Sequence, residues 1–242
     1  MKPSLLKLTL LAVAGVAMLI GLGTWQLQRL FWKQGLTRQI EMRARADSVP
    51  LPVALGNWSQ TSDIEYLRVR LSGTFDHDSE RHLYTVVKGR PGWRIITPLK
   101  TIENTIVMVD RGYVSPSLKN PETRAAGQLR GAVTVTGLAR APGGKNAFTP
   151  ASDLERNIWY WRDLEGMTAS VLDTAERGRL APFFIEADAS PVPGNWPKGG
   201  ATRVKLSNRH LEYVVTWYGL AVALLVVYGA IVWRWRKYGE FT

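Results

Sequence analysis

Residues 213–233 read YVVTWYGLAVALLVVYGAIVW, a run without a charged side chain. As an α-helix with a rise of about 1.5 Å per residue, the run would be about 31 Å long, close to the ~30 Å hydrocarbon core of a bilayer. Glu212 precedes it, and Arg234, Arg236 and Lys237 follow. Tyrosine and tryptophan lie near both ends, as in the two aromatic belts of a spanning helix. The stretch therefore predicts a transmembrane helix rather than a buried core helix.

A second uncharged run lies near the other end of the chain. Residues 8–28 read LTLLAVAGVAMLIGLGTWQLQ and lie between Lys7 and Arg29. A cleavable signal peptide is the alternative, because Lys2 and Lys7 form a short basic start. The apolar run is longer than a usual signal core, however, and it ends in GLGTW, which is not a small-x-small cleavage site. We therefore expect a retained transmembrane helix.

Two spans divide the chain into five parts. The helices at residues 8–28 and 213–233 would place residues 29–212 on one side of the membrane, and residues 1–7 and 234–242 on the other. Charge does not decide which side holds the large domain, because the positive-inside rule applies to short loops.

The region between the spans has the pattern of a strand-rich domain. Apolar and polar side chains alternate from Tyr66 to Phe75, which is typical of a half-buried strand. Further strands are expected at residues 83–87, 93–99, 105–109, 132–139 and 182–187, and one helix at residues 164–177. Polar residues 76–80 predict a turn, and Pro50 and Pro52 predict the end of the first helix. Together these elements favour an α+β domain built on a small β-barrel or a curved antiparallel sheet.

Composition and charge exclude several classes of function. The chain has 242 residues and no cysteine, which excludes disulfides, iron–sulfur clusters, thiolate zinc sites and cysteine nucleophiles. Its net charge of +11 would suit nucleic acid or an anionic membrane. Residues 46–197 hold 17 acidic and 17 basic side chains, so the excess lies beside the two predicted spans. We therefore expect the lipid bilayer, and no nucleic acid, as a partner.

Motifs of catalysis and metal binding are missing from the sequence. It contains no GxGxxG, GxxxxGK[ST], HExxH or GxSxG. Asp76, Asp78 and Glu80 would share one face of an extended chain, but a hard cation requires more oxygen ligands, and a solvated turn is the simpler interpretation. His77 and His82 would point to opposite faces of one strand, so surface positions are favoured over metal ligands. An enzyme, such as a membrane-bound hydrolase, has no positive support.

His210 differs from the other two histidines because of its position. It lies just before the second uncharged run, beside Arg209, and a continuous helix would place Tyr213, Val214 and Trp217 on the same face. A helix N-terminus disfavours the imidazolium, and a neutral imidazole can coordinate iron. A haem bound there would have aromatic side chains on the membrane side of the His210 imidazole and cationic Arg209 on the other side. From the residues alone, an interfacial histidine that anchors a helix is favoured, and a haem ligand is the alternative.

Six blocks of sequence run in order along nearly the whole chain. They are LGTWQLQR at residues 22–29, YLRVRLSGTF at 66–75, GWRIITPL at 92–99, VMVDRGYV at 107–114, VTVTGLAR at 133–140 and NRHLEYVVTWYGLA at 208–221. With the two terminal spans, these blocks resemble the SURF1 (Surfeit locus protein 1) family of cytochrome c oxidase assembly factors. Asp110, where asparagine is expected, and Ser152-Asp153, where an Asn-Asp pair is usual, are mild departures.

The resemblance implies a multi-pass protein of the bacterial inner membrane with its large domain in the periplasm. It implies a carrier or chaperone that binds haem a and assists its insertion into oxidase subunit I, with His210 as the axial ligand of the haem iron. Haem a synthase is a further partner that it implies. We expect Arg209, Tyr213, Trp217 and Trp25 to complete the binding site. A membrane scaffold that stabilises oxidase assembly intermediates without binding haem is the alternative, and no chemical turnover is expected in either case.

Overall fold

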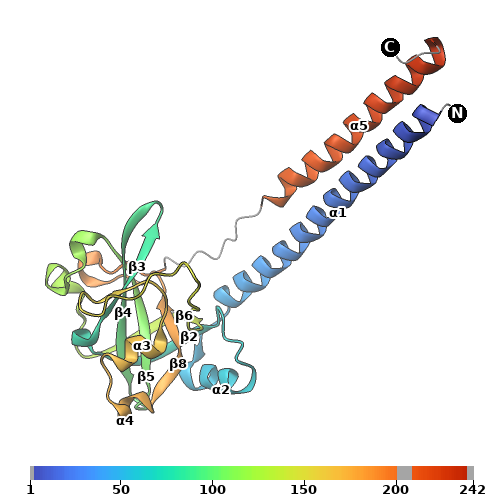
Figure 1. Ribbon diagram of the computed structural model, residues 1–242. Coiled ribbons are helices and arrows are strands. Elements are labelled where there is room, and N and C mark those ends of the chain that lie inside the picture. Colours follow the sequence, from blue (N-terminus) through green and yellow to red (C-terminus); the bar gives the residue numbers. More distant parts are fainter. Residues whose placement is uncertain (1–2, 201–208, 239–242) are drawn as a thin grey trace. The chain divides into compact units, whose positions relative to one another are not determined.

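The computed structural model describes residues 3–200 and 209–238, which belong to two compact units (Figure 1). One unit contains residues 1–39 and 204–242, and the other contains residues 40–203. The first is a pair of helices, and the second is a strand-rich domain.

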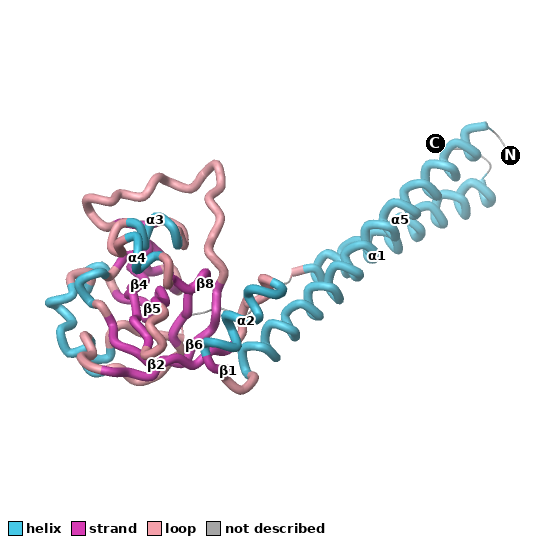
Figure 2. The backbone as a smooth tube through the Cα atoms, turned by 90° about the horizontal axis from the view of Figure 1, so that it is seen from below, coloured by secondary structure: helices cyan, strands magenta, loops and turns pink. Residues whose placement is uncertain are grey.

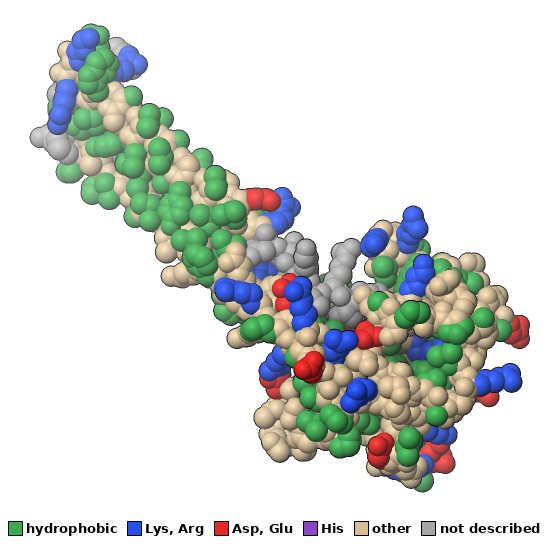
Figure 3. All heavy atoms as spheres, turned by 180° about the vertical axis from the view of Figure 1, so that it is seen from behind, with side chains coloured by type: hydrophobic (Ala, Val, Ile, Leu, Met, Phe, Trp, Pro, Cys, Tyr) green, Lys and Arg blue, Asp and Glu red, His purple; other side chains and the backbone are tan. Residues whose placement is uncertain are grey.

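The two uncharged runs lie in the longest helices of the described chain. α1 spans Pro3–Arg45 and α5 spans His210–Tyr238. Both helices are long and apolar enough to cross a membrane, and few of the residues in their most apolar segments are buried. Apolar side chains cover much of the face of this helix pair that Figure 3 presents. These are the two terminal helices that the sequence predicts, and each continues beyond its uncharged run.

The helices α1 and α5 pack side by side (Figures 1 and 2) through neutral hydrogen bonds and close contacts. The hydroxyls of Thr9 and Tyr228 are 2.7 Å apart, and those of Thr24 and Tyr218 are 3.0 Å apart. A β-carbon added to Gly23 would lie 3.0 Å from the Tyr218 ring. Because lipid provides no hydrophobic drive between helices, small residues and interhelical hydrogen bonds stabilise such a pair.

The strands of the second unit form one sheet that closes on itself (Figure 2). They are β1 (Val49–Pro50), β2 (Arg68–Phe75), β3 (Arg81–Val87), β4 (Arg90–Thr101), β5 (Ile106–Val114), β6 (Ala132–Arg140), β7 (Ile158–Trp159) and β8 (Leu180–Ala187). The sheet order is β1-β2-β6-β8-β5-β4-β3-β7, and β2 also pairs with β4. The circuit β2-β6-β8-β5-β4 is therefore a closed five-stranded barrel, in which only the β5–β8 pair is parallel. The predicted strand-rich α+β domain is confirmed, and of its two expected forms the structure has the barrel.

The barrel encloses the larger of two apolar clusters. Alternate side chains of all five barrel strands contribute to it, including Val69 and Leu71 of β2 and Phe183 of β8. The helix α2 (Leu51–Thr61) packs against this cluster, with the Trp58 ring centroid 6.1 Å from that of Phe183. Phe184 points to the other side of β8 and joins a second cluster with Trp159. The second cluster covers the outside of the barrel.

The short helices depart most from the sequence-based prediction. The sequence predicts one helix over residues 164–177, whereas the structure has α3 (Leu164–Ala169) and α4 (Thr174–Arg177). Asp173 accepts a hydrogen bond from the Glu176 N–H at 2.7 Å, and the Glu176 carboxylate accepts one from the Asp173 N–H. This reciprocal cap begins a new helix at a point where the predicted helix would have continued.

Other short elements connect the strands. The 3₁₀ helices are η1 (His77–Ser79), η2 (Pro116–Leu118), η3 (Pro121–Gly127) and η4 (Pro193–Asn195). η1 forms the turn predicted at residues 76–80. α2 is not predicted, because Pro50 and Pro52 suggest a break; Pro52 instead occupies the first turn of α2, where a missing N–H costs nothing.

Candidate functional site

His210 is the first residue of α5, and its side chain is half-buried. Its Nδ1 atom lies 2.7 Å from Oε1 of Gln26 on α1. An amide oxygen only accepts hydrogen bonds, so Nδ1 carries the proton and donates it. In a neutral imidazole with this tautomer, the lone pair lies on Nε2. Gln26 therefore fixes both the tautomer and the orientation of the ring, as partners of metal-binding histidines do.

Sequence reasoning did not find Gln26. It belongs to the block LGTWQLQR, at the end of the first uncharged run that adjoins the large domain, as His210 does for the second. Since both runs have the same length, residues at matching ends of the two spans face each other in an antiparallel pair. This matching depth is the signal from which the contact could have been predicted.

Tyr213 and Trp217 lie one and two turns after His210 on α5. Val214, on the same side, is buried. Trp217 is half-buried, and its indole N–H has no hydrogen-bond partner in the described part of the chain. A buried donor without an acceptor costs free energy, so a bound molecule that offers an acceptor would be stabilised there. Tyr213 is more exposed and supplies aromatic surface near the end of the helix.

Arg209 and Trp25 are less closely tied to His210. The Arg209 guanidinium donates to the Glu212 carboxylate at 3.0 and 3.1 Å, and 73% of the arginine side chain is exposed. Such a surface ion pair contributes little and exchanges easily for another anion. Trp25 precedes Gln26 by one residue, which places it about 100° around the helix axis, and it is 55% exposed. Trp25 therefore lies on a neighbouring face of α1.

The barrel domain has a polar cleft of about 740 Å³ beside η1. Glu80 lines the cleft, and its Oε1 atom accepts hydrogen bonds from His82 Nε2, at 2.8 Å, and from Arg124. Burial alone would raise the pKa of Glu80, but the hydrogen bond from His82 and the charge of Arg124 lower it overall. Among residues 3–200 and 209–238 there is no group of three or more His, Asp or Glu side chains arranged to hold a metal ion. The polar groups of this cleft are therefore interpreted as a charged network of the barrel wall, made by Glu80, His82 and Arg124.

The same cleft contains His77, in contact with a buried arginine. Arg111 donates to His77 Nδ1 at 3.2 Å, to Gln128 Oε1 at 3.1 Å and to the carbonyl of Gly127. Burial lowers the pKa of Arg111 to about 10. Since His77 Nδ1 accepts from a guanidinium, Nε2 carries the ring proton and donates to the carbonyl of Leu129 at 2.8 Å. His77 is thus held as a neutral ring.

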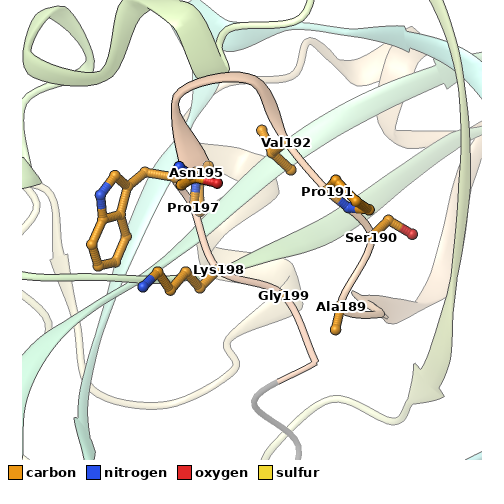
Figure 4. A pocket seen from close by; sticks show the side chains of 9 residues that line it. Ala189, Ser190, Pro191, Val192, Asn195, Pro197, Lys198 and Gly199 are labelled. Atoms are coloured by element: carbon orange, nitrogen blue, oxygen red, sulfur yellow. The ribbon is translucent and has the colours of Figure 1, made fainter.

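A smaller hollow of about 490 Å³ lies in the loop after β8 (Figure 4). Within the described part of the chain its walls come from residues 189–199, and Lys198 is the one ionisable side chain among these lining residues. Lys198 Nζ lies 4.4 Å from the centroid of the Trp196 ring. These lining residues include one cation and no acidic side chain, so they provide no acid–base pair for catalysis.

Known proteins resemble the chain along most of its length. The SURF1 family matches residues 13–222. Surfeit locus protein 1 of Takifugu rubripes is 38% identical over 240 residues, which covers 91% of this chain and 94% of the fish protein. The Homo sapiens protein of the same name is 38% identical over 221 residues, which covers 84% of this chain and 70% of the human protein. A SURF1-like protein of Drosophila melanogaster is 34% identical over 222 residues, which covers 84% of this chain and 70% of the fly protein. The chain belongs to the SURF1 family.

Proposed function

We propose that this protein is an assembly factor of haem-copper cytochrome c oxidase that binds haem a and assists its insertion into oxidase subunit I. Membership of the SURF1 family supports the role in oxidase assembly. The observation that supports haem binding is the 2.7 Å hydrogen bond between His210 Nδ1 and Gln26 Oε1, because it orients the ring for coordination through Nε2.

The surroundings of His210 suit a haem as cargo. Trp217 and Tyr213 supply aromatic surface for an apolar macrocycle, and the exposed pair of Arg209 with Glu212 can open so that the guanidinium meets a propionate. One histidine holds iron less firmly than two, so a histidine of subunit I can replace it. The chain's part is thus to bind, orient and release, without chemical turnover. Trp25 would take part only if the macrocycle reached around α1.

We also propose the location that this role requires. The two apolar helices support a membrane protein. In the proposed topology, residues 29–212 lie in the periplasm of a bacterium, and residues 1–7 and 234–242 lie in the cytoplasm. Haem a synthase would be the donor of the cargo and oxidase subunit I its acceptor, both within the inner membrane.

The test is the absorption spectrum of the full-length protein, purified after co-expression with the enzymes of haem a synthesis. We expect a Soret band that is lost in His210→Ala. Tyr228→Phe is the matched control, since it removes another 2.7 Å hydrogen bond between α1 and α5 without touching the ring. An unchanged band in His210→Ala would contradict the ligand assignment.

A scaffold that stabilises oxidase assembly intermediates without haem is the second candidate. The separate barrel domain of residues 40–203 is the observation that favours it, because a carrier of haem between spans does not require such a domain. Co-purification of oxidase subunits with both the parent and His210→Ala, without a Soret band in either, would establish the scaffold instead.

A further inference from the structure

The hairpin of β3 and β4 extends beyond the strands that flank it. β5 pairs with β4 only as far as Trp93, and β7 pairs with β3 only as far as Leu83. Residues 84–87 and 90–92 therefore pair only with each other. Figure 1 shows this end of the hairpin projecting from the barrel.

The tip of the hairpin is a tight two-residue turn. Val87 pairs with Arg90, and the residues between them, Lys88 and Gly89, have φ angles of 52° and 76°. Two successive positive φ values are typical of the type I′ turn, whose twist matches that of the strands. The turn therefore fixes the positions from which the side chains of Lys88 and Arg90 extend.

One face of the projecting hairpin is apolar and aromatic. Tyr84 pairs with Trp93 and Val86 pairs with Pro91, so the alternation of strands places all four on the same face. The Tyr84 ring centroid lies 5.8 Å from that of Trp93 and 6.0 Å from that of Tyr160. Tyr84 is 41% exposed and Val86 is 55% exposed. These five residues form what we call the hairpin face.

The opposite face is covered from within the domain. A β-carbon on Gly92 would overlap the Tyr113 ring, so the ring lies directly on this glycine. The Tyr113 hydroxyl also donates to the carbonyl of Pro91 at 3.0 Å. Because a two-stranded hairpin alone is only marginally stable in water, this support keeps the hairpin in place while its apolar face stays exposed.

The charged residues in the sequence of the hairpin all have one sign. Between Glu80 and Glu103 every charged side chain is basic: Arg81, Lys88, Arg90, Arg94 and Lys100. Lys88 and Arg90 are exposed and form no ion pair with the described residues of the chain. Lys119 Nζ lies 4.6 Å from the centroid of the Trp93 ring. Basic side chains beside tyrosine and tryptophan are the combination that binds the interface of an anionic bilayer.

We propose that the hairpin face, with Lys88 and Arg90 at its tip, binds the anionic headgroup layer of a bilayer. The two cations meet lipid phosphates, while Tyr84, Val86 and Trp93 enter the boundary between headgroups and acyl chains. The apolar helices of the same chain would hold the domain close to such a surface, which raises the effective concentration of lipid. Lys88 and Arg90, the exposed charges at the tip of the hairpin, are both cationic, which favours an anionic lipid surface as the occupant.

The test uses the absence of cysteine from the sequence. An environment-sensitive fluorophore on Val86→Cys reports lipid contact in the full-length protein, reconstituted into nanodiscs of phosphatidylcholine alone or with phosphatidylglycerol. We expect a blue shift and quenching by lipid-attached quenchers only with phosphatidylglycerol, and their loss in Lys88→Glu/Arg90→Glu. Ile102→Cys is the matched control, because Ile102 is 79% exposed beyond the other end of β4 but adjoins Glu103.

Three results would overturn the proposal. One is an aqueous signal from residue 86 in both bilayers, which would leave a protein as the occupant of the hairpin face. Another is lipid contact that persists in the charge-reversed variant with an unchanged melting temperature. The third is an equal response from the label at residue 102, which would mean unspecific adsorption of the domain.

Discussion

The helix pair and the barrel domain hold their polar groups in different ways. In the described helix pair, the hydrogen bonds between helices join hydroxyls, an amide and an imidazole: Thr9 with Tyr228, Thr24 with Tyr218, and Gln26 with His210. In the barrel, the buried polar groups are mostly charged and joined into networks. A charge is costly in a hydrocarbon medium, whereas a barrel wall can surround it with opposite charges. The polar groups of the helix pair are thus arranged as an apolar medium requires, and those of the barrel as a water-soluble domain allows.

The charged network of the barrel centres on two carboxylates from neighbouring strands. Glu186 lies 2.8 Å from Arg162, 3.1 Å from Arg140 and 3.5 Å from Arg94. Asp110 is fully buried and is also paired with Arg94. Burial raises the pKa of Asp110 although the charge of Arg94 opposes this shift. Removal of Glu186 would therefore take away the ion-pair partner of Arg162 and leave Arg140 and Arg94 with one carboxylate each, Glu65 and Asp110.

The largest expected effect follows from this network. Glu186→Ala should lower the free energy of unfolding by about 3–5 kcal/mol, the range for a buried ion pair that loses one partner. Chemical denaturation of the full-length protein measures it. Glu155→Ala, at an exposed position, should change stability by less than about 0.5 kcal/mol. Equal effects of the two substitutions would show that the network does not stabilise the barrel.

A smaller effect is expected where the helix pair depends on close packing. Gly23→Leu places atoms against the Tyr218 ring and should weaken the association of α1 and α5 by about 1–3 kcal/mol. Gly21→Leu is the matched control, because a β-carbon on Gly21 would meet nothing within 4 Å. The yield of cross-links between cysteines placed at residues 9 and 228 measures the association. A lower yield with the control alone would refute this view of the contact.

Gln26 belongs to the helix pair and is also the hydrogen-bond partner of the proposed haem ligand, His210. Gln26→Leu removes the acceptor of His210 Nδ1 and should weaken haem binding about 10- to 100-fold, as loss of a ligand's hydrogen-bond partner does. Gln26→Glu keeps an acceptor and should retain affinity. Haem titration followed by absorbance distinguishes the cases. Loss of binding in His210→Ala with no change in Gln26→Leu would keep the proposed function but reject the role of Gln26.

The features found from the sequence are those with a local signal. An uncharged run identifies a span, and the alternation from Tyr66 to Phe75 identifies β2. Barrel closure depends instead on the pairing of Gly73 with Thr101, which are far apart in the chain. Gly73 was a usable clue, because a glycine inside a strand pattern marks a close approach of backbone, and a β-carbon there would overlap the Lys100 carbonyl. His210 was found from its position, while Gln26 required the pairing of two helices.

The smallest expected effect concerns the pH dependence of the barrel. Burial lowers the pKa of His77 and the charge of Arg111 adds to this, against the hydrogen bond to Leu129. The unfolded chain therefore binds more protons than the folded chain below the ordinary histidine pKa of 6.5, so stability falls as the pH drops through that value towards the lower folded pKa. Denaturation midpoints at about pH 7.5 and 5.5 measure the loss.

His77→Gln should reduce this loss, since a glutamine can bond to Arg111 or Leu129 but does not titrate. The chosen range stays above the region where Glu80, whose folded pKa is lowered from 4.5, begins to lose its own contribution. An undiminished loss in His77→Gln would assign the pH dependence to another group. A diminished loss would mean that the barrel, unlike the neutral hydrogen bonds of the helix pair, ties its stability to the protonation of one half-buried ring, that of His77.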